Sequence, residues 1–151
     1  MNDLNPAMCA RMRENAEAVR ATVECHPGRM EDLPLPDESV DAVLSNGVIN
    51  LSADKPAVFA AAATALRPGG RLALADIVTA KPLPDAITCD ASLWAACIGG
   101  AAQRDDYLAM ITEAGFAVEA VRDNDYRFVS ERAVGATTTY GVSSISVLAR
   151  R

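Results

Sequence analysis

The apolar positions of this chain recur at spacings that predict alternating helices and strands. Residues 6–20 carry apolar side chains at helical spacing, and the asparagine before them can cap a helix that starts with proline. A second helix follows the possible caps Ser52 and Asp54 and is ended by a Pro-Gly-Gly turn; its inner stripe is Val58, Phe59, Ala62, Ala63 and Leu66. Apolar runs at 41–45 and 71–78 flank this helix and are typical of fully buried strands. Because strand, helix, glycine turn and strand form a βαβ crossover, the pattern predicts an α/β fold with a parallel sheet.

The alternation continues to the end of the chain. The other predicted elements are a short strand at 22–26, helices at 85–100 and 103–115, and strands at 116–123 and 142–150. The pattern between residues 126 and 141 is mixed and predicts at most one further helix. Since no linker or repeat interrupts this order, we expect a single domain over residues 1–151.

Composition limits the classes of partner. Half of the 151 residues are hydrophobic, which is enough for one sizeable core. The formal charge of −6 argues against a nucleic-acid partner, because phosphate contacts need clustered lysine and arginine. We find no apolar run of the length that spans a membrane, and the chain is expected to be cytoplasmic, with a small molecule or a protein as its partner.

The cysteines do not suggest a metal site. Cys9, Cys25, Cys89 and Cys97 lack CxxC spacing, and His26 is the only histidine that could join them. We therefore expect no metal ligands and no disulfide framework, and interpret the four cysteines as free thiols, buried at least in part.

Several blocks of the sequence resemble one family. The stretch EDLPLPDESVDAVLSNGVINLSADKPAVFAAAATALRPGGRLALADIV, then LWAACIGG and YLAMITEAGF, is similar to class I S-adenosylmethionine-dependent methyltransferases of the arsenite methyltransferase-like branch. The likeness runs along essentially the whole chain. It implies a Rossmann-like parallel sheet with helices on both faces and an antiparallel last strand, S-adenosylmethionine as cofactor, and methyl transfer to a small-molecule acceptor.

The resemblance also implies cofactor-binding residues. The DLNPAM stretch places Asp3 where an acidic residue receives the ribose hydroxyls, and a carboxylate can accept both hydrogen bonds. The alternative role of Asp3 is that of a turn or capping residue. Met30 and Glu31 match positions that hold the adenine, with a solvated acidic loop as the alternative.

The end of the strand at 41–45 is matched to the methionine end of the cofactor and to the acceptor. Ser45, Asn46 and Gly47 stand there, and small polar residues allow a close approach. In arsenite methyltransferases cysteines matching Gly47 and Cys97 bind trivalent arsenic, so this chain lacks one thiolate of that pair. The acceptor is therefore left open. No catalytic residue is assigned, because in-line methyl transfer works mainly by proximity and orientation.

The resemblance implies a first strand and a Gly-rich cofactor turn ahead of the DLNPAM stretch, and this sequence contains neither. We therefore expect an incomplete sheet, an N-terminally truncated domain and weak cofactor binding by this chain alone. The strand at 41–45 would have an open edge, which residues 22–26, a second copy or a separate strand could cover. The expected partner is thus a homo-oligomer or a strand-completing chain. Two functions stay open, a methyltransferase and a catalytically silent remnant or binding module.

Overall fold

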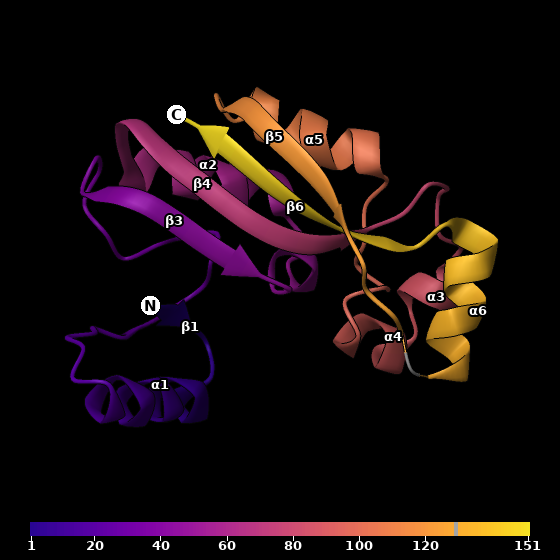
Figure 1. Ribbon diagram of the computed structural model, residues 1–151, viewed down its shortest axis with the longest axis horizontal. Coiled ribbons are helices and arrows are strands. Elements are labelled where there is room, and N and C mark those ends of the chain that lie inside the picture. Colours follow the sequence, from indigo (N-terminus) through magenta and orange to yellow (C-terminus); the bar gives the residue numbers. More distant parts are fainter. Residues whose placement is uncertain (129) are drawn as a thin grey trace.

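The computed structural model describes residues 1–128 and 130–151, and it confirms the α/β class. Its main feature is a four-stranded sheet in the order β3-β4-β6-β5 (Figure 1). These strands are β3 (Val40–Asn46), β4 (Leu66–Val78), β5 (Ala117–Asn124) and β6 (Ser143–Arg150). β3 runs parallel to β4, whereas β6 is antiparallel to both of its neighbours. The expected antiparallel last strand is therefore confirmed.

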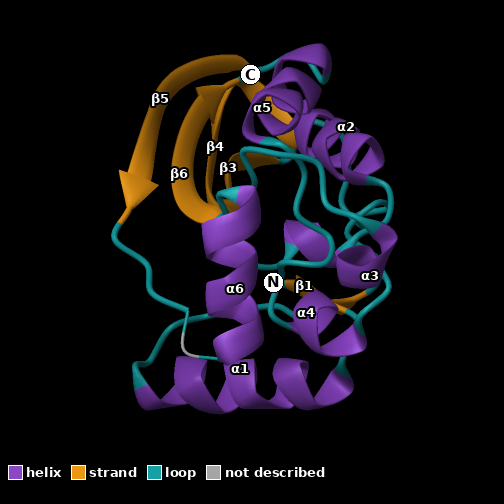
Figure 2. Cartoon of the chain, turned by 90° about the vertical axis from the view of Figure 1, so that its right-hand side faces the viewer, coloured by secondary structure: helices purple, strands orange, loops and turns teal. Residues whose placement is uncertain are grey.

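Two helices cover one face of this sheet (Figure 2). They are α2 (Lys55–Ala65) and α5 (Arg104–Glu113). Asp54 caps α2 by accepting the Ala57 N–H, and the whole predicted inner stripe is buried. Its last member, Leu66, was predicted in the helix but is the first residue of β4. We expected helices on both faces, but in the described part of the chain the opposite face carries none. Leu44 on that face is 80% exposed.

The region after β4 contains two short helices where the pattern predicted one. One helix was expected over 85–100, but the chain forms α3 (Asp85–Thr88) and α4 (Ala91–Ala95). The break arises because Asp90 accepts the N–H groups of Ser92 and Leu93 and so starts a new helix. A further helix, α6 (Glu131–Tyr140), lies in the stretch that gave no clear pattern; residue 129 of that stretch lies outside the described residues.

The N-terminal residues form a small unit apart from the main sheet (Figures 1 and 2). It contains β1 (Asn2–Asp3), α1 (Pro6–Ala18) and β2 (His26–Pro27), and β1 pairs in parallel with β2. Of the strand expected at 22–26, only His26 lies in a strand, and residues 22–25 do not. It also does not pair with β3, so our first alternative for covering that edge was wrong.

Helix α1 was predicted correctly, but its apolar positions are largely exposed. Met8 is 50% and Val19 is 74% exposed, whereas Cys9 and Ala16 are the residues that the helix buries. The helix packs against its own small unit, so few of its apolar side chains find a neighbour.

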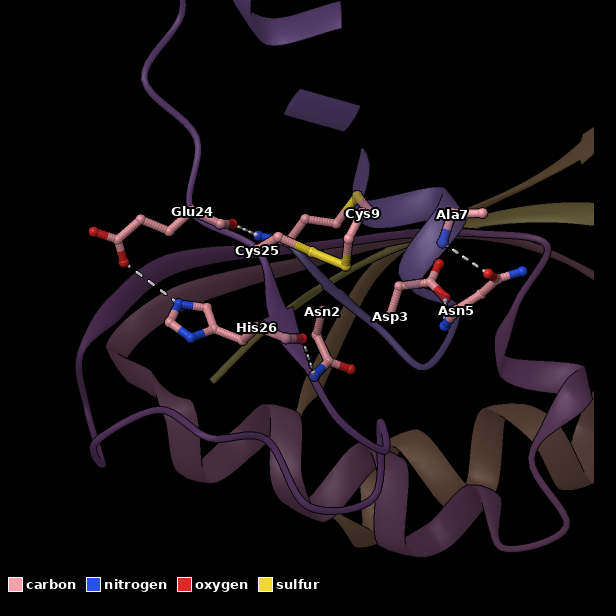
Figure 3. The surroundings of a disulfide bond; sticks show 9 residues. Asn2, Asp3, Asn5, Ala7, Cys9, Glu24, Cys25 and His26 are labelled. Carbon is pink, nitrogen blue, oxygen red and sulfur yellow. Dashed lines mark hydrogen bonds and ion pairs between the residues drawn. A yellow bond between two sulfur atoms is a disulfide. The ribbon is translucent and has the colours of Figure 1, made fainter. Parts of the chain in front are cut away.

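The expectation of four free thiols was wrong for two cysteines. Cys9 and Cys25 form a disulfide that joins α1 to the segment before β2 (Figure 3). Pairing of β1 with β2 brings the first turns of α1 beside Cys25, a proximity that a separation of 16 residues did not reveal. Cys89 and Cys97 are free, as expected.

Loss of this disulfide is expected to loosen the N-terminal unit selectively. A disulfide closing a loop of this length contributes about 3 kcal/mol through the entropy of the unfolded chain. Under limited proteolysis followed by mass spectrometry, Cys9→Ser should be cleaved much faster within residues 1–28, with cleavage of the sheet unchanged. Cys89→Ser, which alters an exposed free thiol, is the control. Equal cleavage of Cys9→Ser and the unaltered chain within 1–28 would contradict this.

Candidate functional site

The parallel strands β3 and β4 end close together, and polar residues gather beyond them. Gly47 follows β3 with φ of 66°, a left-handed conformation that glycine adopts without strain. Its carbonyl accepts a hydrogen bond from the Cys97 thiol at 2.9 Å. Immediately afterwards the short helix η1 (Ile49–Leu51) turns Asn50 inward beneath the strand ends.

Asn50 and Asp76 form the centre of a buried polar network. The Asn50 side chain is fully buried and Asp76 is 2% exposed. Asn50 Nδ2 lies 2.8 Å from Asp76 Oδ1 and 2.6 Å from the Ile77 carbonyl, and it also faces the Cys97 carbonyl at 3.3 Å. Tyr107 donates its hydroxyl to Asp76 Oδ2 at 3.2 Å. The network therefore joins η1, β4, α5 and the loop after α4 in one arrangement.

Burial raises the pKa values of two groups in and beside this network. It raises the pKa of Asp76 above its usual range, and hydrogen bonds from Ile77, Tyr107 and Asn50 offset only part of that effect. Burial, followed by the nearby Asp76 carboxylate, also raises the pKa of the Cys97 thiol. The neutral thiol is thus favoured at Cys97.

Lys55 adds a buried amine close to the network. Its Nζ donates to the Ser52 carbonyl at 3.1 Å. Burial lowers the pKa of this amine, and the charge of Asp76 offsets part of the effect. The strand ends thus combine a buried carboxyl, a buried amine and a thiol in one region.

A cavity of about 510 Å³ separates the N-terminal unit from β3. One wall includes Asn2 and His26 and the other includes Val43, with α2 side chains among the lining. Met30 and Ser45 both line it. The Ser45 hydroxyl is buried and has no hydrogen-bond partner in the part of the chain that the structure describes. This cavity therefore combines an apolar lining with a polar group that a ligand could engage.

Glu31 is fixed beside the cavity without lining it. Its Oε1 accepts the Ser52 hydroxyl at 2.5 Å and pairs with Arg29 at 3.2 Å. These interactions, the Ser52 hydrogen bond first, lower the pKa of the Glu31 carboxyl. Glu31 is therefore held as a carboxylate next to Met30.

Asp3 lies at the end of β1, where the resemblance placed it, but is not among the cavity-lining residues. Its Oδ1 accepts the Asn5 N–H at 2.8 Å, and Asn5 in turn caps α1 through Ala7 (Figure 3). The turn role considered for Asp3 is thus present. Asn46 lies on the uncovered sheet face with Ala75 and Ser146. Of the six predicted residues, the structure brings Met30 and Ser45 into one cavity and leaves Asp3 apart from it.

Sequence reasoning missed the buried network of Asn50, Asp76 and Tyr107. A signal was present, since Asp76 is the only charged residue in the apolar run from Leu72 to Val78. A buried acid in such a run needs hydrogen-bond donors, but their positions depend on how distant segments pack.

Known proteins agree with this fold. Residues 2–115 match the family described as a methyltransferase domain. The arsenite methyltransferase of Halobacterium salinarum is 42% identical over 132 residues, which are 85% of this chain and 34% of that protein. CrArsM, an arsenic (III) S-adenosylmethionine methyltransferase from Chlamydomonas reinhardtii, superposes with a TM-score of 0.76 at 24% identity over 99% of this chain and 53% of CrArsM. The geranyl diphosphate C-methyltransferase of Streptomyces coelicolor A3(2), solved with Mg²⁺, geranyl diphosphate and S-adenosyl-L-homocysteine, superposes with a TM-score of 0.80 at 16% identity over 99% of this chain and 61% of the other.

The chain belongs to the methyltransferase domain family. Within that family it is arsenite methyltransferase-like, and the predicted resemblance is confirmed. The chain spans about a third of the length of the curated relatives it matches. Among the helices in the described residues, none has the length and apolar character needed to cross a membrane.

Proposed function

We propose that this chain takes part in methyl transfer from S-adenosylmethionine to a small-molecule acceptor. The observation that carries the proposal is the match of residues 2–115 to the methyltransferase domain. The cavity beside β3 and the polar strand ends support it, because ligands of open α/β sheets bind outside the carboxyl ends of the strands.

In this proposal the residues of the site bind and orient the cofactor and the acceptor and do not exchange protons with them. Asp3 receives the ribose hydroxyls, while Met30 and Glu31 meet the adenine. Ser45, Asn46 and Gly47 face the methionine end and the acceptor. The cofactor supplies the sulfonium methyl group, and the chain contributes proximity and orientation. The unpartnered Ser45 hydroxyl supports this assignment, since it lines the cavity that also contains Met30.

The acceptor is proposed to be an organic small molecule rather than arsenite. Curated relatives of this chain act on arsenite by name. Here Gly47, in place of a second cysteine, offers only a carbonyl to Cys97, and burial raises the pKa of the Cys97 thiol. A lone neutral thiol does not chelate a soft metalloid ion as a thiolate pair does.

We further propose that the chain alone binds the cofactor weakly and needs a homo-oligomer or a strand-completing partner. The unpaired outer edge of β3 and the uncovered sheet face support this. The second candidate function is a binding module without methyl transfer, which the uncovered sheet face also favours. We propose the cytoplasm as the setting of this chain. The free thiols Cys89 and Cys97 are compatible with a reducing compartment. The Cys9–Cys25 disulfide is expected to be reduced there.

Titration of the ¹⁵N-labelled chain with S-adenosyl-L-homocysteine, followed by NMR, tests the cofactor assignment. The expected dissociation constant is about 1 mM or weaker, with shifts confined to amides near Asp3, Met30, Ser45 and Gly47. Asp3→Ala should weaken binding by about 1.5–3 kcal/mol through loss of a charge-assisted hydrogen bond. Asp125→Ala, an exposed acid elsewhere, should have no effect.

Two results would count against parts of this proposal. An absence of shifts at these amides with several millimolar ligand would remove the cofactor assignment. Saturable binding much tighter than millimolar would instead show that the chain needs no partner, and methyl transfer could then be assayed directly.

A further inference from the structure

Helix α4 ends in a motif that normally contains glycine. The Cys97 N–H donates to the Trp94 carbonyl and the Ile98 N–H donates to the Leu93 carbonyl, each at 2.9 Å. These two hydrogen bonds define a Schellman motif, in which the residue at the place of Cys97 adopts left-handed backbone. Cys97 does so, with φ of 61°. A residue with a Cβ is disfavoured in this conformation and persists there only where other contacts hold it.

The contacts that hold Cys97 join it to the end of β3. Its thiol donates to the Gly47 carbonyl at 2.9 Å, across 50 positions of sequence. The Asn50 side-chain amide donates to the Cys97 carbonyl at 3.3 Å, and the same amide donates to Asp76 and to the Ile77 carbonyl on β4. Cys97 is therefore anchored to the sheet through Asn50, and it in turn holds Gly47. We call the hydrogen bonds from Asn50 to Cys97 and from Cys97 to Gly47 the Cys97 clamp.

The clamp fixes the direction of the backbone at the end of β3. The Gly47 N–H donates to the Ala75 carbonyl on β4 at 2.9 Å, so the residue is held at its N–H by the sheet and at its carbonyl by Cys97. A Cβ added to Gly47 would meet no atom of the described residues within 4 Å. A ligand that approaches the end of this strand would thus meet backbone whose orientation Cys97 sets.

We propose that Cys97 is a positioning residue, whose thiol holds the Gly47 peptide in the orientation with which the end of β3 meets the methionine part of the cofactor. The inference rests on the proposed function, which places Ser45, Asn46 and Gly47 at that part of the ligand. Cys97 acts through Gly47, and no covalent bond forms or breaks at its sulfur. Its contribution is orientation, on which in-line methyl transfer depends.

Substitutions of Cys97 separate this role from a purely structural one. If Cys97 only ended α4, glycine would serve better, because glycine adopts the left-handed conformation without strain. Cys97→Gly therefore keeps the end of the helix but removes the clamp. Cys97→Ser retains a side-chain donor and should preserve the clamp. Cys89→Ser, which alters an exposed free thiol, is the control.

The first measurement is NMR of the full chain labelled with ¹³C and ¹⁵N. The ¹³C shift of the Gly47 carbonyl reports the hydrogen bond that its oxygen accepts. In Cys97→Gly this signal should move upfield, because its donor is lost. In Cys97→Ser and Cys89→Ser it should stay close to its position in the unaltered chain.

The second measurement compares two ligands by NMR titration. S-adenosyl-L-homocysteine has the methionine-derived part, whereas adenosine lacks it. Cys97→Gly is expected to raise the dissociation constant of S-adenosyl-L-homocysteine about threefold to tenfold, the effect of one hydrogen bond, and to leave that of adenosine unchanged. Cys97→Ser should restore the affinity. A general structural defect would weaken the binding of both ligands alike.

The outcomes separate the alternatives. A shifted Gly47 carbonyl signal with selective loss of S-adenosyl-L-homocysteine affinity in Cys97→Gly, and rescue of both by Cys97→Ser, supports the proposal. An unmoved Gly47 signal, unchanged affinity, equal weakening of both ligands or unfolding of Cys97→Gly overturns it.

Failure of the proposed function gives a different result. The unaltered chain would then show no binding of S-adenosyl-L-homocysteine at several millimolar, and the positioning role would be overturned with it. Binding by the unaltered chain that Cys97→Gly leaves unchanged would overturn the positioning role alone.

Discussion

Gly100→Ala is expected to lower the free energy of unfolding by about 2–3 kcal/mol, because the new methyl group has no space. A Cβ at this position would overlap the backbone carbonyl oxygen of Asn50, and backbone cannot move aside as a flexible side chain can. Displacing Asn50 would also disturb its hydrogen bonds to Asp76 and Ile77. Urea unfolding followed by circular dichroism measures the change.

Gly135→Ala is the matched control for this substitution. Gly135 lies within α6, and a Cβ there would meet no atom within 4 Å. Alanine should stabilise the helix by about 0.4–1 kcal/mol, since it restricts the unfolded chain more than glycine does. If Gly100→Ala proves as stable as the unaltered chain, then Gly100 does not lie as close to the Asn50 carbonyl as described here.

Asp76→Leu is expected to cost about 2–4 kcal/mol in the free energy of unfolding. The leucine removes the acceptor of the Tyr107 hydroxyl and one acceptor of the Asn50 amide, and each buried donor left unpaired costs about 1–3 kcal/mol. Asp76→Asn keeps an oxygen acceptor and should cost less than about 1 kcal/mol. Asp41→Asn, which alters an exposed ion pair with Arg67, should change stability by less than about 1 kcal/mol. Equal stability of Asp76→Leu and Asp76→Asn would show that the network does not stabilise the fold.

The pH dependence of stability provides a second measurement on Asp76. Its pKa is raised in the folded state, so the folded chain keeps a proton that the unfolded chain has already lost. Stability of the unaltered chain should therefore fall as pH rises from the ordinary carboxyl range, near about 4, through the raised pKa. Asp76→Asn lacks this contribution, so the difference between the two unfolding free energies should change across that window. Lys55, Tyr107 and Cys97 also face Asp76, and its charge contributes to the pKa shift of each, so the measured difference includes their response to the loss of that charge. A constant difference across the window would contradict the raised pKa.

The sequence predicted the central crossover well because its signals are local. The inner stripe of α2 recurs at helical spacing, and every predicted member is buried. β3 and β4 appeared as apolar runs, and the structure extends β3 by one residue at each end. β4 begins at Leu66, so it includes the Pro-Gly-Gly stretch that was predicted as a turn. Family membership came from the same region, where many residues agree over a long stretch.

The candidate site could be predicted only in part. Ser45 and Met30 were matched to cofactor positions, and the structure places both at one cavity. Their roles, and that of Asp3, stay predictions. The disulfide was missed because cysteine spacing does not state which segments fold together, and Cys9 meets Cys25 only after β1 pairs with β2.

The kind and order of most elements, and the family of this chain, follow from the amino-acid sequence, since hydrophobic periodicity and long local similarity depend on neighbours along the chain. The folded structure was needed to show that Asn50, Asp76 and Tyr107 share one buried network. It also decided that the expected N-terminal turn, MNDLNPAM, belongs to a small unit across a groove from β3. These features depend on contacts between residues about 25 to 40 positions apart, and no local pattern records which distant segments will meet.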